Sequence, residues 1–141
     1  MQRGAILHLS VSHVYKIKMD LGGGTNNYEK IIAAKNLIHF ALTKNCHHLQ
    51  LFGDSQIICN WINRTTHCNT YTLQHILDET HRFISHFDIF SCRHIYRECN
   101  SVADSLSKVA AHRDDSNWLI VEERDGNKYQ YYHRPFIVLG T

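Results

Sequence analysis

Three side chains of this sequence have the chemistry of a metal-ion site, and each lies where an expected secondary-structure element begins or ends. Asp54 follows the short apolar run 48–52, and His94 lies at the end of an expected strand. Asp104 lies in the first turn of an expected helix. Magnesium prefers oxygen ligands, so one or two carboxylates and substrate phosphates can complete its coordination shell. Two such ions about 4 Å apart can activate a water for phosphodiester cleavage, which is the chemistry that this combination indicates.

Each of these residues also has a structural explanation when it is considered alone. Asp54 could cap a helix that begins at Ser55, and its position by itself favours that role. Asp104, with Ser101 as N-cap, fits a variant of the capping box and complements the helix dipole. A single histidine at a strand end is usually structural. Two isolated carboxylates with a histidine just upstream of one of them nevertheless favour the metal site.

The elements that must position these residues alternate between strands and helices. Residues 5–21 contain two period-2 stretches that predict a hairpin, and a glycine run follows them. Further along, the apolar periodicity predicts helices over 28–44, 55–63, 73–87 and 101–112, and strands over 48–52 and 88–96. This order predicts an α/β domain in which a mixed sheet carries helices on its faces.

The composition changes beyond His112. Two alternating runs flank Asp125 and Gly126, and this pair is the strongest hairpin signal in the sequence. We therefore predict a main domain over 1–112 and a C-terminal hairpin extension, or arm, over 113–141.

Bulk composition restricts the classes of function. A chain of 141 residues suits a single folded domain. Its formal net charge of +2 is too small to predict a nucleic-acid partner from bulk electrostatics. The sequence contains no signal peptide and no apolar run long enough to span a bilayer. We expect an intracellular protein, in the nucleus or the cytoplasm, that is a monomer and has no membrane partner.

Cysteine and histidine side chains are the usual ligands of zinc, and this sequence contains 5 and 12 of them. The five cysteines form an odd set without a C-x-x-C pair, which argues against a disulfide framework and suits a reducing compartment. Residues 46–48 form one Cys/His cluster, and Cys92, His94 and Cys99 form another. Neither cluster has the spacing of a zinc ribbon or zinc finger, so scattered surface and half-buried histidines are the better interpretation.

Three segments together resemble the ribonuclease H family. They are "GTNN" at 24–27, "LFGDSQII" at 51–58 and "HIYRECNSVADSLSKVA" at 94–110. The sequence is most similar to the reverse-transcriptase-associated, retroelement-derived domains common in plant genomes, over residues 4–111. The resemblance implies a five-stranded mixed sheet with helices, in the order βββαβαβα. It also implies cleavage of RNA in RNA–DNA hybrids by two magnesium ions that four carboxylates hold.

The resemblance assigns roles to single residues. Asp54 matches the third metal-binding carboxylate of the family, and Asp104 matches the fourth. His94 matches a histidine that assists proton transfer or product release. Asn26 and Asn27 match asparagines that contact the hybrid across its minor groove, where groove shape and 2′-hydroxyls are recognised rather than base sequence.

The first departure from the family pattern concerns its central first strand, which carries the first carboxylate. No matching strand precedes Gly4 in this sequence. We therefore expect an N-terminally truncated domain whose central strand is missing. The hairpin at 5–21 and the strand at 48–52 would then lack their shared neighbour and leave open ladder edges.

The second departure concerns the glutamate of the family pattern T-N-N-x-x-E. The matching position here is Lys30, one residue after Glu29. On a helix, Lys30 shares a row with Ala34, Leu37 and Ala41 that can face the sheet. Glu29 points away from this row, and with Asn26 as N-cap it occupies the N3 position of a capping-box-like start. A protonated lysine cannot ligate magnesium.

Three hypotheses remain open. The first is a ribonuclease H-type domain whose ancestral magnesium-dependent reaction is impaired in this copy. The second is a non-catalytic module that binds hybrid or double-stranded nucleic acid, and the third is a decayed retroelement fragment. The residues expected to contact nucleic acid are Asn26, Asn27, Lys30, Arg97, Asn100 and Lys108.

Overall fold

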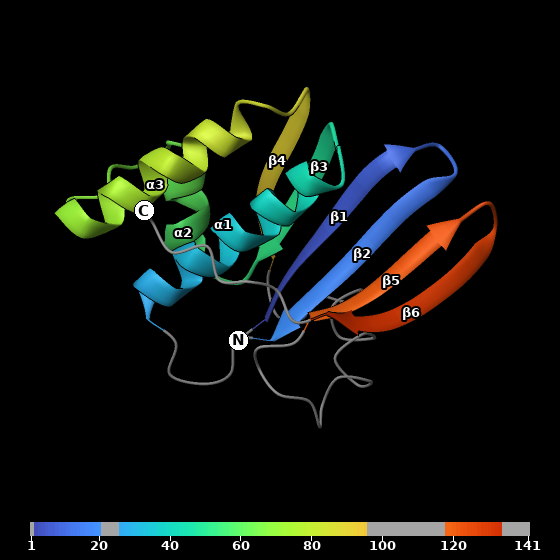
Figure 1. Ribbon diagram of the computed structural model, residues 1–141. Helices are drawn as coiled ribbons and strands as arrows, with labels where there is room; N and C mark the ends of the chain where they lie inside the picture. The colour runs from blue at the N-terminus through green and yellow to red at the C-terminus, as the bar shows by residue number, and fades with distance from the viewer. Residues whose placement is uncertain (1, 21–25, 96–117, 134–141) are drawn as a thin grey trace.

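The computed structural model describes residues 2–20, 26–95 and 118–133. In these ranges the chain forms a six-stranded sheet and three helices (Figure 1). The elements in chain order are β1 (Gln2–Ser10), β2 (His13–Asp20), α1 (Asn27–Thr43), β3 (His48–Gly53), α2 (Gln56–Ile62), α3 (Tyr71–Ile84), β4 (Ile89–His94), β5 (Trp118–Arg124) and β6 (Asn127–His133). The predicted helix over 101–112 lies outside the described residues.

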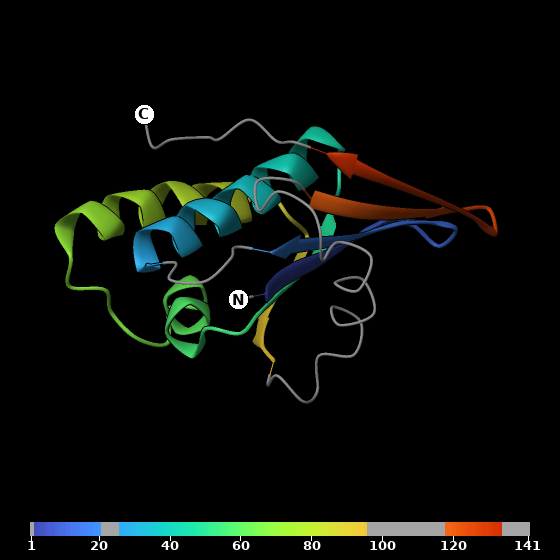
Figure 2. The same cartoon turned by 90° about the horizontal axis from the view of Figure 1, so that it is seen from below.

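The strand order in the sheet is β4-β3-β1-β2-β5-β6. The β3–β4 pair is parallel, whereas the other four neighbouring pairs are antiparallel. Helices α1 and α3 lie side by side, and α2 packs near β3 and β4 (Figure 1, Figure 2). The predicted mixed sheet with flanking helices is therefore confirmed.

The expectation of open ladder edges around β1 and β3 is wrong. β1 pairs directly with β3 over residues 3–8, and its other edge pairs with β2. Backbone hydrogen bonding does not depend on side-chain identity, so a strand with one apolar face can occupy this central place. Gly4 suits the close packing there, because a Cβ atom at this position would lie 3.0 Å from the backbone oxygen of Ile17.

The core lies between the sheet and α1. Period-2 alternation places Ala5 and Leu7 of β1 on the same buried face as Leu49 and Leu51 of β3. On α1 every residue over 31–38 is buried, including two polar ones. A surface helix would bury one stripe, whereas α1 is enclosed because the sheet covers one side and α3 packs against another.

A buried ion pair joins α1 to α3. Lys35 Nζ donates to Glu79 Oε2 at 2.5 Å, and His75 Nε2 lies 3.3 Å from the other carboxylate oxygen. The Lys35 side chain is 0% exposed and that of Glu79 is 10% exposed. The hydrogen bond from Lys35 holds the pKa of Glu79 below its usual range. The pair thus ties α1 to α3 at one position on each helix.

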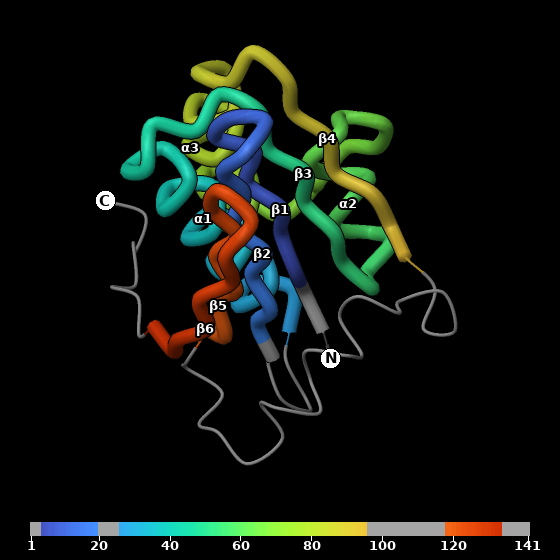
Figure 3. The backbone as a smooth tube through the Cα atoms, turned by 90° about the vertical axis from the view of Figure 1, so that its right-hand side faces the viewer, coloured from blue at the N-terminus to red at the C-terminus, as the bar shows by residue number. Residues whose placement is uncertain are grey.

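The predicted C-terminal hairpin forms and extends the sheet (Figure 3). Its turn has φ of 53° at Asp125 and 83° at Gly126, the positive values that a two-residue type I′ turn requires. β5 pairs with β2 along its whole length, and Trp118 and Ile120 are buried in the core. The division of the chain at residue 112 stays a prediction, since 96–117 lie outside the described residues.

Candidate nucleic-acid site at the carboxyl ends of β3 and β4

Asp54 and His94 meet at one edge of the sheet because their strands are parallel neighbours. Gly53 of β3 lies opposite His94 of β4, and the Ile95 N–H donates to the Gly53 carbonyl at 2.9 Å. The His94 ring Nε2 lies 3.2 Å from the backbone oxygen of Asp54. In the tautomer that carries a proton on Nε2, the ring donates to this carbonyl and keeps Nδ1 as an acceptor. The carboxyl ends of such strands are where open α/β sheets bind ligands.

Asp54 is not the cap of α2, so the simpler explanation of this residue is wrong. The N-cap is Ser55, whose Oγ accepts from the backbone N–H of Ile58 at 3.4 Å. β3 ends at Gly53 and α2 begins at Gln56, which leaves two connecting residues. The second of these has the capping geometry, so the helix start does not account for the Asp54 carboxylate.

The start of α1 agrees with the sequence prediction. The Asn26 side-chain oxygen accepts from the Glu29 backbone N–H at 2.9 Å, which confirms Asn26 as the N-cap. Glu29 is exposed. Lys30 is half-buried and begins the predicted row, whose next members Ala34 and Leu37 are fully buried. Asn27 is half-buried as the first residue of the helix. Of these two half-buried positions at the start of α1, Lys30 carries a cation.

Several predicted site residues lie outside the described part of the chain. They are Asp104, Arg97, Asn100 and Lys108. Their proximity to Asp54 therefore stays a prediction. Within 2–20, 26–95 and 118–133, no group of three or more His, Cys, Asp or Glu side chains is placed to hold a metal ion.

The first Cys/His cluster is held in other contacts. The Cys46 thiol is buried, with Sγ 3.1 Å from the His48 carbonyl, and burial raises the pKa of this thiol. The exposed His47 ring lies 3.9 Å from a carboxylate oxygen of Asp88. The His48 ring stacks on His8, with ring centroids 4.4 Å apart. Cys46, Cys59, Cys68 and Cys92 are buried, and none of these four forms a disulfide.

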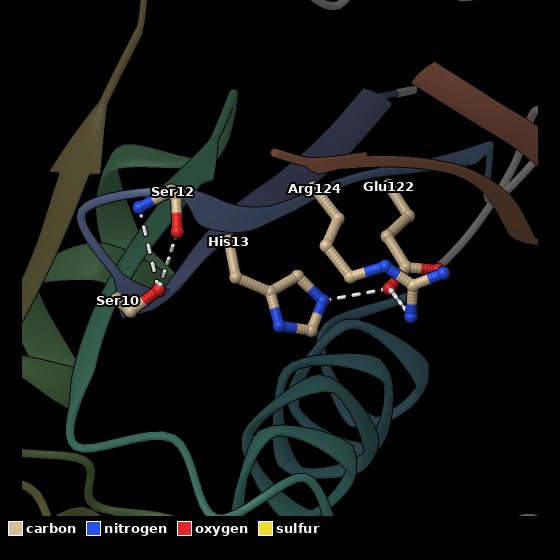
Figure 4. A network of polar contacts seen from close by, with 5 residues as sticks. All are labelled: Ser10, Ser12, His13, Glu122 and Arg124. Carbon is tan, nitrogen blue, oxygen red and sulfur yellow. Dashed lines mark hydrogen bonds and ion pairs between the residues drawn. The ribbon is translucent and has the colours of Figure 1, made fainter. Parts of the chain in front are cut away.

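A polar network that the sequence patterns did not reveal links β2 with β5 (Figure 4). His13 Nε2 lies 2.6 Å from Glu122 Oε2, and Arg124 Nη1 lies 3.8 Å from the same oxygen. Burial raises the pKa of Tyr15 to about 12, and the nearby Glu122 charge adds to this effect. For Glu122 burial acts to raise the pKa, but hydrogen bonds from His13 and Tyr15 outweigh it and lower the pKa. Local spacing gave no signal because the partners are far apart in sequence.

Comparison with known proteins supports the class that this fold and sheet edge define. The family model described as reverse transcriptase-like matches residues 32–110. A solved structure, ribonuclease H1 from the halophilic archaeon Halobacterium salinarum NRC-1, matches with a TM-score of 0.53 and 20% identity. The match covers 74% of this chain and 89% of that one. A comparison with curated proteins gives no match.

The chain belongs to the reverse transcriptase-like family and is an RNase H-like domain. Among its described helices, none is long and apolar enough to cross a membrane.

Proposed function

We propose that this RNase H-like domain binds RNA–DNA hybrid or double-stranded nucleic acid and that its hydrolytic reaction is impaired. One observation supports both parts. Asp54 lies beside His94 at the ligand-binding edge of the sheet, while Lys30 occupies the α1 position where the resemblance expects a carboxylate. The matching family model supports a retroelement origin for the domain.

The residues at this edge do not by themselves make a two-magnesium site. RNase H-like proteins generally use magnesium, and that ion needs several oxygen ligands. Among the residues that the structure describes, Asp54 is the one carboxylate of the set that the resemblance assigns. The ammonium group of Lys30 repels a divalent cation. The described residues therefore do not fit a two-magnesium site, and this disagreement is the reason for proposing impairment.

The residues at the start of α1 suit the recognition of a nucleic-acid backbone. Lys30 supplies a positive charge for a phosphate, and Asn27 supplies an amide that can bond a base edge or a 2′-hydroxyl. The Asn26 oxygen is used by the helix cap, which leaves its NH₂ group as a donor. Contacts of this kind read groove shape rather than sequence, so we expect weak sequence preference and strong salt dependence.

Cleavage and binding are tested together on one labelled RNA–DNA hybrid. We expect hybrid binding that weakens steadily as salt rises, with little magnesium-dependent cleavage. Asp54→Asn is the matched control, because it removes the carboxylate charge and keeps the side-chain shape. Robust cleavage that Asp54→Asn abolishes would overturn the impairment, and lack of binding at low salt would overturn the binding role. Light scattering on the same sample tests the prediction of a monomer.

A further inference from the structure

A cavity of about 200 Å³ lies at the C-terminal end of α2. From that end the chain crosses to α3 (Figure 2). The α2–α3 connection and the facing side of α3 line it. The polar part of the lining comes from Arg64, Thr66 and His67. An apolar wall is formed by Trp61 and Leu77. Among the described residues that line the cavity there is no carboxylate.

Arg64 is the charged group of this lining. Arg64 is exposed, and no described carboxylate oxygen lies within ion-pair distance of its guanidinium. Arg124 and Lys128 of the hairpin are also exposed, but each has a glutamate partner. Asp78, the nearby acid on α3, accepts instead from Gln74 Nε2 at 2.9 Å. A guanidinium presents its donors in a planar fork that matches a phosphate or carboxylate.

The backbone of Arg64 has a left-handed conformation that is unfavourable for arginine. Arg64 has φ of 61° and is the first residue after the α2 C-cap, a position that normally selects glycine. The Arg64 N–H donates to the Trp61 carbonyl at 3.2 Å, and the Thr65 N–H donates to the Asn60 carbonyl at 2.9 Å. These two bonds form a Schellman motif and fix the loop in this conformation.

The end of α1 provides an internal comparison. There Asn45 has φ of 58°. The Asn45 N–H donates to the Leu42 carbonyl at 3.0 Å, and the Cys46 N–H donates to the Ala41 carbonyl at 3.0 Å. The motif is the same, but it carries asparagine, which tolerates the left-handed region far better than arginine does. A strained residue is retained where the surrounding structure over-determines it, and such residues cluster at functional sites.

His81 closes the α3 side of the cavity. Its Nε2 lies 3.1 Å from the Ile62 carbonyl and 3.3 Å from the Trp61 carbonyl, so this nitrogen donates to the last turn of α2. Burial lowers the pKa of His81, and the charge of Arg64 lowers it further. The ring is therefore neutral near pH 7 and satisfies carbonyl groups that would otherwise repel an anion at this helix end.

We propose that this cavity binds a phosphate monoester, with the Arg64 guanidinium as its charged contact and the Trp61–Leu77 wall covering the organic part. Such a group is carried by a free nucleoside monophosphate or by the 5′ end of a nucleic-acid strand. The site is distinct from the proposed nucleic-acid edge, because Asp54 precedes the first residue of α2 and Arg64 follows its last. A helix of seven residues separates the two ends by roughly 10 Å.

Calorimetric titration tests the site with inorganic phosphate, a nucleoside 5′-monophosphate, and one oligonucleotide with either a 5′-phosphate or a 5′-hydroxyl. We expect saturable binding of the monophosphate that is tighter than that of inorganic phosphate. Arg64→Gly should weaken it at least tenfold while raising the melting temperature, because glycine relieves the left-handed backbone. The matched control Asn45→Gly changes the equivalent cap and should leave binding unchanged.

The outcomes separate the two sources and the two proposed sites. The ligand is a strand end if the 5′-phosphorylated oligonucleotide binds more tightly than both the 5′-hydroxyl oligonucleotide and the mononucleotide. Otherwise the ligand is the free nucleotide. Bound monophosphate should also raise the pKa of His81 in a proton NMR titration. Asp54→Asn should bind monophosphate normally even if hybrid binding fails. The absence of saturable binding, or equal binding by Arg64→Gly, would overturn the assignment.

Discussion

The buried pair between α1 and α3 allows a prediction whose size follows from the structure. In the wild-type protein the Lys35 side chain is 0% exposed, and its ammonium group lies 2.5 Å from a Glu79 carboxylate oxygen. Glu79→Gln keeps the shape of the side chain but removes the carboxylate charge. Removing one partner of a buried ion pair costs about 3–5 kcal/mol. Because the glutamine oxygen can still accept a hydrogen bond, we expect the lower end, about 3 kcal/mol. For a domain of this size that loss lowers the melting temperature by roughly 10 °C.

Urea unfolding followed by circular dichroism measures this loss. The double variant Lys35→Met, Glu79→Leu removes both charges and should be more stable than Glu79→Gln, since no buried charge is left unpaired. The pKa of Glu79 is lowered in the folded state, so its stabilising contribution is complete above the unfolded value near 4.5. It is lost as the pH falls through the folded pKa. The difference between wild type and Glu79→Gln should therefore shrink in acid.

Two results would refute this reasoning. A loss below about 1 kcal/mol at pH 7 would mean that the ammonium group remains solvated when its partner is removed. A loss that stays constant from pH 7 down to pH 2 would mean that the Glu79 charge is not responsible for it.

Three further predictions concern the helix start, the hairpin and the site. Asn26→Ala should cost about 1 kcal/mol of unfolding free energy by losing the cap, whereas Asn26→Asp should retain it, as urea titration will show. Trp118→Ala should cost about 3–5 kcal/mol in the same assay, because Trp118 is buried in the core; a loss below about 1 kcal/mol would contradict its packing there. Lys30→Glu should raise magnesium-dependent hybrid cleavage above wild type, and unchanged cleavage would argue that Lys30 does not face the site.

Within the described residues, local patterns predicted the elements and the start of α1 correctly, whereas the helix expected over 101–112 stays a prediction. Alternation identified the β1–β2 hairpin and β3, and the Asp125–Gly126 pair identified the last turn because I′ turns need positive φ at both residues. The cap at Asn26 followed from its spacing to Glu29. These features depend on neighbours within a few residues, which a sequence displays directly.

The partners of each strand did not follow from the sequence in the same way. The resemblance led us to expect a missing neighbour between the first hairpin and β3, yet β1 itself pairs with β3. Ladder hydrogen bonds use backbone atoms that every residue has, so the sequence does not mark which strands will pair. The ion pair of Lys35 with Glu79 and the contact of His13 with Glu122 join residues too far apart for any local spacing to indicate.

At the candidate site, the sequence by itself determined the residue types and their places at element ends. It named Asp54 and His94 and put Lys30 where a carboxylate was expected. Only the tertiary structure decided that the first two meet, because the parallel pairing of β3 with β4 brings both carboxyl ends to one edge. It also decided that Ser55, rather than Asp54, caps α2. Cap geometry depends on backbone angles at single residues, and residue identity alone does not fix those angles.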